Sequence, residues 1–92
     1  MISITKAHYA KFKKYCTKWI SFFGLETEWD ITFSYLKGDG DNGASCRWDI
    51  ESKSATMVLY YPWNDNHGSL KEMNLDRVLN EYALHEVLEL LL

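Results

Sequence analysis

The chain has 92 residues and a net charge of −3 at pH 7. Its residues are 47% hydrophobic and 15% aromatic, a composition that excludes a disordered chain, and the negative charge excludes the basic surface expected of a nucleic-acid binder. The length predicts a single domain that spans residues 1–92.

The first predicted element is a helix that begins after Thr5 and ends before Gly24. Thr5 is a suitable N-cap, and Gly24 is suited to the left-handed position after a helix. Apolar residues between them recur at spacings of three and four, which marks one face of a helix: Tyr9, Phe12, Cys16, Trp19, Ile20 and Phe23.

Period-two alternation predicts two strands after this helix. Residues 29–35 alternate between apolar and polar side chains, and residues 44–51 do the same. In the second strand we expect the inward face to carry Ala44, Cys46, Trp48 and Ile50. Between the strands, Asp39-Gly40-Asp41-Asn42-Gly43 fails the calcium-loop pattern because Gly43 stands at the fifth position, so we interpret it as a hairpin turn.

A third strand is predicted at residues 55–61. It is apolar on both faces apart from Thr56, which favours a central position in the sheet, and Pro62 ends it. Residues 52–54 are few enough to close a hairpin with the second strand. Ser69 and Glu72 form a predicted capping box for a last helix that runs to the chain end. The predicted fold is therefore α+β: a helix, a three-stranded and mainly antiparallel sheet, and a helix.

Cys16 and Cys46 both fall on predicted inward faces, and two cysteines are few for a disulfide scaffold of this size. We expect buried, reduced thiols. The sequence has no signal-peptide pattern and no apolar run long enough to cross a membrane, so we expect a soluble protein of the cytoplasm.

The last predicted helix carries the motif His85-Glu86-Val87-Leu88-Glu89. At 100° per residue, the imidazole and the two carboxylates share one narrow sector of a helix that is otherwise apolar nearly all round. His85 and Glu89 are neighbours on the helix surface and can reach one ion, with Glu86 beside them to accept a proton from water. This is the logic of the zinc motif H-E-x-x-H with Glu at the second His position. A solvent-facing stripe is the alternative interpretation.

The helix of residues 83–92 resembles the active-site helix of small zincin-like metallopeptidases of bacteriophages, which carry HEVxH, or sometimes HEVxE, followed by Leu-Leu. The resemblance covers nearly the whole chain, and its helix motif is more specific than its upstream matches. Those matches are Ile4-Thr5-Lys6, Phe12-Lys13, Trp19-Ile20, Phe22-Phe23-Gly24-Leu25, Trp29-Asp30-Ile31 and Ala44-Ser45-Cys46.

The resemblance implies a minimal zincin scaffold, a zinc cofactor held by His85 and Glu89, and Glu86 as general base. It also implies a third ligand after the motif helix, but the sequence ends three residues beyond Glu89. Of the upstream candidates His67, Asp65, Cys46 and His8, we predict His67 as the third ligand.

Two functions stay open on this basis. One is a metallopeptidase homologue, active or degenerate, that acts on a peptide or protein substrate in the cytoplasm of the host cell. The other is a non-catalytic phage protein that binds or inhibits a host protein, or forms a homodimer, through its Leu-rich C-terminal helix. We expect neither a nucleic-acid nor a membrane partner.

Overall fold

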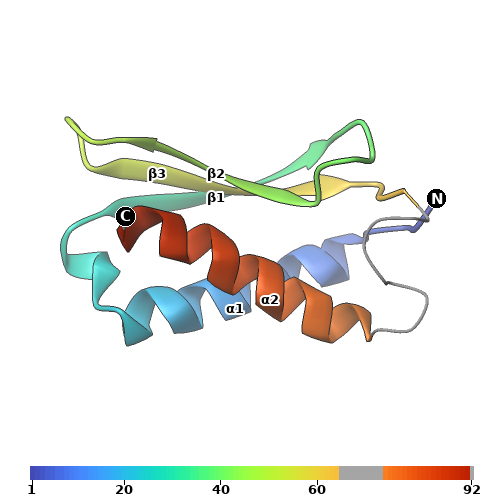
Figure 1. The fold of residues 1–92 in the computed structure, drawn as a ribbon, viewed down its shortest axis with the longest axis horizontal. Coiled ribbons are helices and arrows are strands. Elements are labelled where there is room, and N and C mark those ends of the chain that lie inside the picture. Colours follow the sequence, from blue (N-terminus) through green and yellow to red (C-terminus); the bar gives the residue numbers. More distant parts are fainter. Residues whose placement is uncertain (65–73, 92) are drawn as a thin grey trace.

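The computed structural model describes residues 1–64 and 74–91. The chain forms α1 (Lys6–Phe22), β1 (Asp30–Lys37), β2 (Ala44–Asp49), β3 (Ser54–Tyr61) and α2 (Leu75–Leu88), with short 3-10 turns η1 (Leu25–Thr27) and η2 (Glu89–Leu91). Figure 1 shows two layers, in which α1 and α2 lie side by side and cover the same face of the sheet. The predicted α+β class and the order of its elements are confirmed.

The N-terminus of α1 is fixed by its predicted cap. The hydroxyl of Thr5 accepts the His8 N–H at 3.3 Å, and the Thr5 N–H donates to His8 Nδ1 at 2.8 Å. At the other end, Gly24 adopts a φ of 69°, a left-handed conformation that residues with a side chain rarely adopt. Both predicted ends of the helix are confirmed.

The sheet has the order β1-β3-β2, so β3 is central as predicted. β2 and β3 form the expected antiparallel hairpin, whereas β1 pairs with β3 in parallel. The sheet is therefore mixed rather than mainly antiparallel, and residues 39–43 do not close a hairpin. The physical reason is the apolar character of β3 on both faces, which places it between the other two strands and separates β1 from β2.

Trp48 in β2 and Ile50 just beyond it are exposed, although both were predicted to be buried on the inward face. Cys46 is buried as expected, but Trp48 is 50% exposed and Ile50, just beyond the strand, is 65% exposed. The alternation of side chains fixes the side of the sheet on which each residue lies, and β2 is an edge strand. At this end of the strand, Trp48 and Ile50 line an open cavity instead of filling the core.

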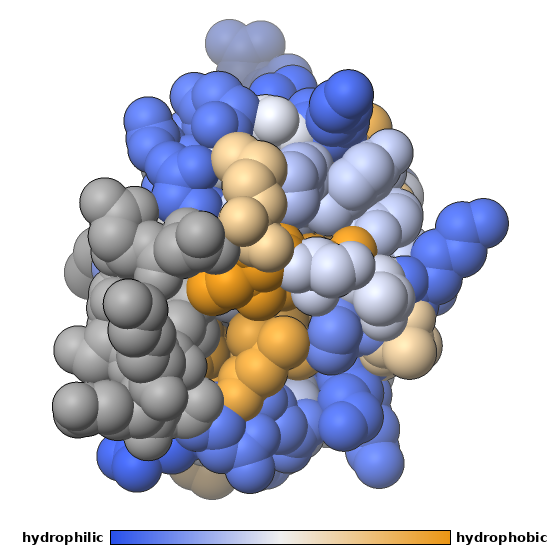
Figure 2. All heavy atoms as spheres, turned by 90° about the vertical axis from the view of Figure 1, so that its right-hand side faces the viewer, coloured by the Kyte–Doolittle hydropathy of each residue, from blue (hydrophilic) through white to orange (hydrophobic). Residues whose placement is uncertain are grey.

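The core lies between the two helices and the inner face of the sheet. Its largest fully buried side chains include Trp63, Phe12, Met57, Leu59 and Leu79. Figure 2 views the end of the molecule at which the chain begins, where apolar residues are bordered by hydrophilic ones. Cys16 and Cys46 are free and buried, as predicted.

The contact between α2 and α1 includes polar as well as apolar side chains. Tyr15 donates a hydrogen bond to Asp76 at 2.6 Å, and Trp19 Nε1 donates to Asn80 Oδ1 at 3.0 Å. The predicted capping box at residues 69–72 lies outside the described residues. Asn74 caps α2 at Leu75, and its side chain accepts the N–H of Asp76. Within residues 1–64 and 74–91, no helix combines the length and the apolar content needed to cross a membrane.

Candidate metal centre

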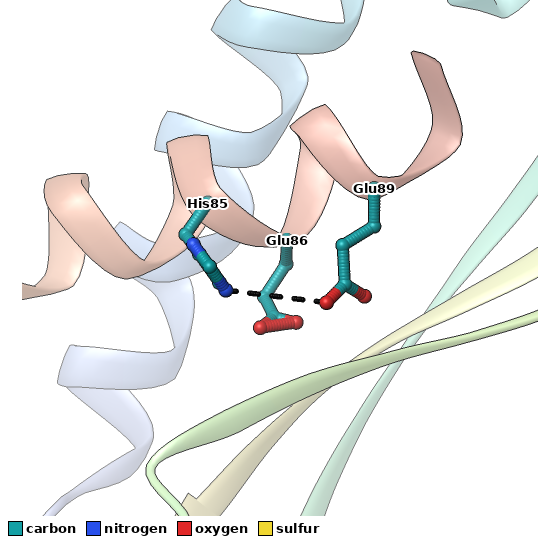
Figure 3. Close-up of side chains that lie close together, drawn as sticks. All are labelled: His85, Glu86 and Glu89. Carbon is teal, nitrogen blue, oxygen red and sulfur yellow. Dashed lines mark ion pairs between the residues drawn. The ribbon is translucent and has the colours of Figure 1, made fainter. Parts of the chain in front are cut away.

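The motif near the end of α2 gathers three potential metal ligands on one side of the helix. His85, Glu86 and Glu89 each offer an atom, and these atoms lie within 4.8 Å of one another. Figure 3 shows the three side chains leaving α2 in the same direction, towards the sheet. The helical spacing of one and four residues produces this arrangement, so it follows from local structure alone.

His85 and Glu89 are separated by a distance that a metal ion can bridge. His85 Nε2 lies 3.9 Å from Glu89 Oε1, the pair marked by the dashed line in Figure 3. Two ligands at about 2.1 Å from a tetrahedral ion lie about 3.4 Å apart. The His85 side chain is 73% exposed and is free to rotate by the small amount needed.

Glu86 occupies a different environment from the other two residues. It is only 6% exposed, and its Oε2 has no hydrogen-bond partner among the described residues. Burial, reinforced by the negative charge of Glu89 and opposed by His85, raises the pKa of Glu86 to about 7. A buried carboxyl group without a partner is costly, so this atom marks a position suited to a proton or a cation.

Two cavities are lined in part by these three residues. The first, of about 220 Å³, is lined by His85 and Glu86 on one side and by Asp41 and Asn42 on the other. The second, of about 400 Å³, is lined by Trp29, Trp48, Ile50, Glu89 and Leu90. The candidate ligands therefore lie between a polar cavity and a mainly apolar one, both bordered by residues of β2 or its end.

Cys46 is close to the candidate ligands but is not equivalent to them. Burial raises the pKa of its thiol to about 12, and the negative charges of Glu89 and Glu86 act in the same direction. A neutral thiol is a poor metal ligand, because the thiolate is the binding species. His8 is occupied by the cap of α1 and is not part of the cluster in the described residues.

The other predicted ligands, His67 and Asp65, lie outside the described residues. Sequence reasoning missed Asp41 and Asn42, whose loop was interpreted as a hairpin turn and which line the same cavity as His85 and Glu86. It also missed the cavity at Trp48 and Ile50, because the alternating pattern predicted burial for both. The carboxylate of Asp41 and the amide of Asn42 could have been recognised in the sequence as polar groups of a site. Their position in the fold, however, depends on the strand order.

Comparisons of the chain with protein-family models, with curated proteins and with solved structures found no match. The resemblance to phage zincin-like peptidases remains a prediction. The functional argument therefore depends on the geometry of the described residues.

Proposed function

We propose that this chain is a phage-type zincin-like metallopeptidase homologue whose metal centre is built on His85, Glu86 and Glu89. The observation that carries this proposal is the buried carboxylate oxygen of Glu86, which lies beside two potential ligands and has no hydrogen-bond partner among the described residues. If Glu86 were only part of a solvent-facing stripe, its carboxylate would be exposed.

The donor set fits a divalent ion. An imidazole nitrogen and carboxylate oxygens are acceptable zinc ligands, and the second carboxylate moves the preference somewhat towards harder ions. In this proposal His85 and Glu89 hold zinc. His67 stays the predicted third protein ligand.

Glu86 is the proposed proton acceptor. A bound divalent ion would lower the pKa of water and would polarise the carbonyl group of a substrate. Because the pKa of Glu86 lies at about 7, this side chain can take a proton and return it near neutral pH.

A peptide is the substrate that best suits the surroundings. β2 pairs only with β3 among the described residues, so its other edge is open to an extended chain. Ala44 borders the polar cavity and Trp48 the apolar one, which places the candidate ligands beside the middle of the strand. In the cytoplasm of a host cell, the free thiols of Cys16 and Cys46 would stay reduced.

The test combines metal binding with hydrolysis. Calorimetric titration of chelator-treated protein with zinc should give one equivalent for the wild type and at least a tenfold weaker affinity for His85→Ala and Glu89→Gln. Glu86→Gln should retain zinc and lose peptide hydrolysis. Glu81→Gln, an exposed carboxylate on the same helix, is the matched control and should bind zinc like the wild type. Equal, near-zero binding by wild type and His85→Ala would exclude the metal centre.

A second candidate function is a non-catalytic protein that binds a host protein, or a second copy of itself, through the end of α2. Leu88 and Leu91 are exposed there, and Phe22 is exposed at the end of α1. Both helices end on the same side of the molecule (Figure 1). Light scattering of the wild type and of Leu91→Glu tests self-association. A monomer that hydrolyses peptides would contradict this candidate.

A further inference from the structure

The polar cavity beside the candidate ligands has a second wall, which comes from the connection between β1 and β2. Asp41 and Asn42 of this loop line the same 220 Å³ cavity as His85 and Glu86. Among the described residues that line the cavity, Asp41 has the one charged side chain outside the motif. An exposed carboxylate such as Asp41 does not by itself define a site, but Glu86 lines the same cavity, and its buried Oε2 has no hydrogen-bond partner among the described residues.

We propose that Asp41 is a positioning residue of the metal centre, which accepts a hydrogen bond from the ion's water of hydration across this cavity. The proposal rests on the proposed function and extends it. Asp41 lies outside the cluster whose ligand atoms are within 4.8 Å of one another, so an indirect contact fits better than direct coordination. The cavity has room for several water molecules, each of which occupies about 30 Å³.

The coordination chemistry explains why such a residue is needed. Together with a third protein ligand, His85 and Glu89 would leave at least one position of a four-coordinate ion to water. A water molecule at that position would donate hydrogen bonds and require an acceptor, and the ion would make it a stronger donor. A carboxylate that faces the ion across the cavity supplies an acceptor and a compensating charge.

The loop is held in a defined position, as a positioning residue requires. The Asp41 N–H donates to Asp39 Oδ1 at 2.9 Å, and Asn64 Nδ2 donates to Asp41 Oδ1. The Asn64 N–H also donates to the carbonyl of Gly40 at 3.0 Å. Gly40 has a φ of 95°, which favours glycine, and a Cβ at this position would also force the Asn64 side chain to shift.

The loop offers a pair of variants that isolate the role of Asp41. Asp41→Asn keeps the size of the side chain and an oxygen that can accept from Asn64, but removes the charge. Asp39→Asn removes the same charge from the same loop and keeps an oxygen that can accept the Asp41 N–H, and Asp39 does not line the cavity at His85. The two variants therefore have equal net charge and differ only in which carboxylate is lost.

Calorimetric titration with zinc, with cobalt as a second probe, provides the test. We expect Asp41→Asn to raise the zinc Kd by about 10- to 100-fold, which is the usual effect of removing a residue that hydrogen-bonds to a group bound to the metal. We expect Asp39→Asn to change it by less than about threefold, because loss of charge at a distance is screened. Thermal unfolding of both metal-free variants should match the wild type, which separates positioning from folding.

Each outcome has a distinct meaning. If the wild type binds zinc, His85→Ala abolishes binding and the two loop variants behave alike, the role of Asp41 is refuted and the metal centre stands. If the wild type binds no zinc, both the metal centre and the role of Asp41 are refuted. If Asp41→Asn lowers the free energy of zinc binding by no more than it lowers the free energy of unfolding of the metal-free protein, the residue acts on folding. Its role as a positioning residue is then refuted.

Discussion

The buried carboxyl group of Glu86 should make the stability of the metal-free protein depend on pH. Folding raises the pKa of this group from its ordinary value of 4.5 to about 7, mainly through burial. At about 1.4 kcal/mol per pKa unit, this difference corresponds to roughly 3 kcal/mol. Because the pKa is raised in the folded state, the contribution of protonated Glu86 to the free energy of unfolding is fully present below about pH 4.5. This contribution is lost as the pH rises through about 7.

Replacement of Glu86 by Gln removes this dependence while it keeps the side-chain size. At pH 8 the wild type has an ionised, buried carboxylate, so Glu86→Gln should be more stable by about 1–3 kcal/mol. The upper end is the full ionisation cost, and the lower end allows for the buried amide that is left without a partner. At pH 4.5 the two proteins should differ by less than about 1 kcal/mol.

Urea unfolding followed by circular dichroism between pH 4.5 and 8, in the presence of a chelator, measures this difference. Asp76 does not interfere, because hydrogen bonds from Tyr15 and Lys11 lower its pKa, and its contribution is lost only at more acidic pH. Glu81→Gln, with its exposed carboxylate, should follow the wild type across the range. A gap between wild type and Glu86→Gln that stays constant with pH would refute the reasoning.

The remaining predictions concern packing and thiol chemistry. Phe12 is fully buried, so Phe12→Ala should lower the free energy of unfolding by about 3–5 kcal/mol in urea titrations, whereas Trp48→Ala, at a half-exposed position, should cost less than about 1 kcal/mol. Similar costs for both would contradict the assignment of the core. Burial raises the pKa values of Cys16 and Cys46, so both thiols should react slowly with a disulfide reagent at pH 8 in the native protein and rapidly after unfolding. Rapid reaction of either thiol in the folded state would show that it is accessible.

The sequence predicted those parts of the fold that depend on local patterns. The spacing of Phe12 and Cys16, together with Thr5 and Gly24, defined α1 because capping and helical periodicity act within a few residues. The apolar character of β3 on both faces likewise placed it in the centre of the sheet. These features require no knowledge of which element packs on which.

Features that depend on tertiary contacts were not predictable in the same way. Trp48 lies on the expected side of β2, but alternation says nothing about whether another element covers that position. The Gly- and Asp-rich loop correctly predicted a break between two strands, yet its composition does not identify the partner of β1. Within the candidate site, the spacing of His85 and Glu89 was predictable because both are on one helix, whereas the approach of Asp41 was not.

The strand order explains why this loop reaches the motif at all. Adjacent strands lie about 4.8 Å apart, so a connection between β1 and β2 that passes the end of β3 must span about 10 Å. Residues 38–43 can cover this distance, since each extended residue adds about 3.3 Å. A tight hairpin between β1 and β2 would keep the turn at the ends of those two strands alone. With β3 between them, the connection instead crosses the end of the central strand and enters β2 beside α2, where Asp41 lines the same cavity as His85. The candidate centre thus depends on the topology of the sheet as much as on the spacing within the motif.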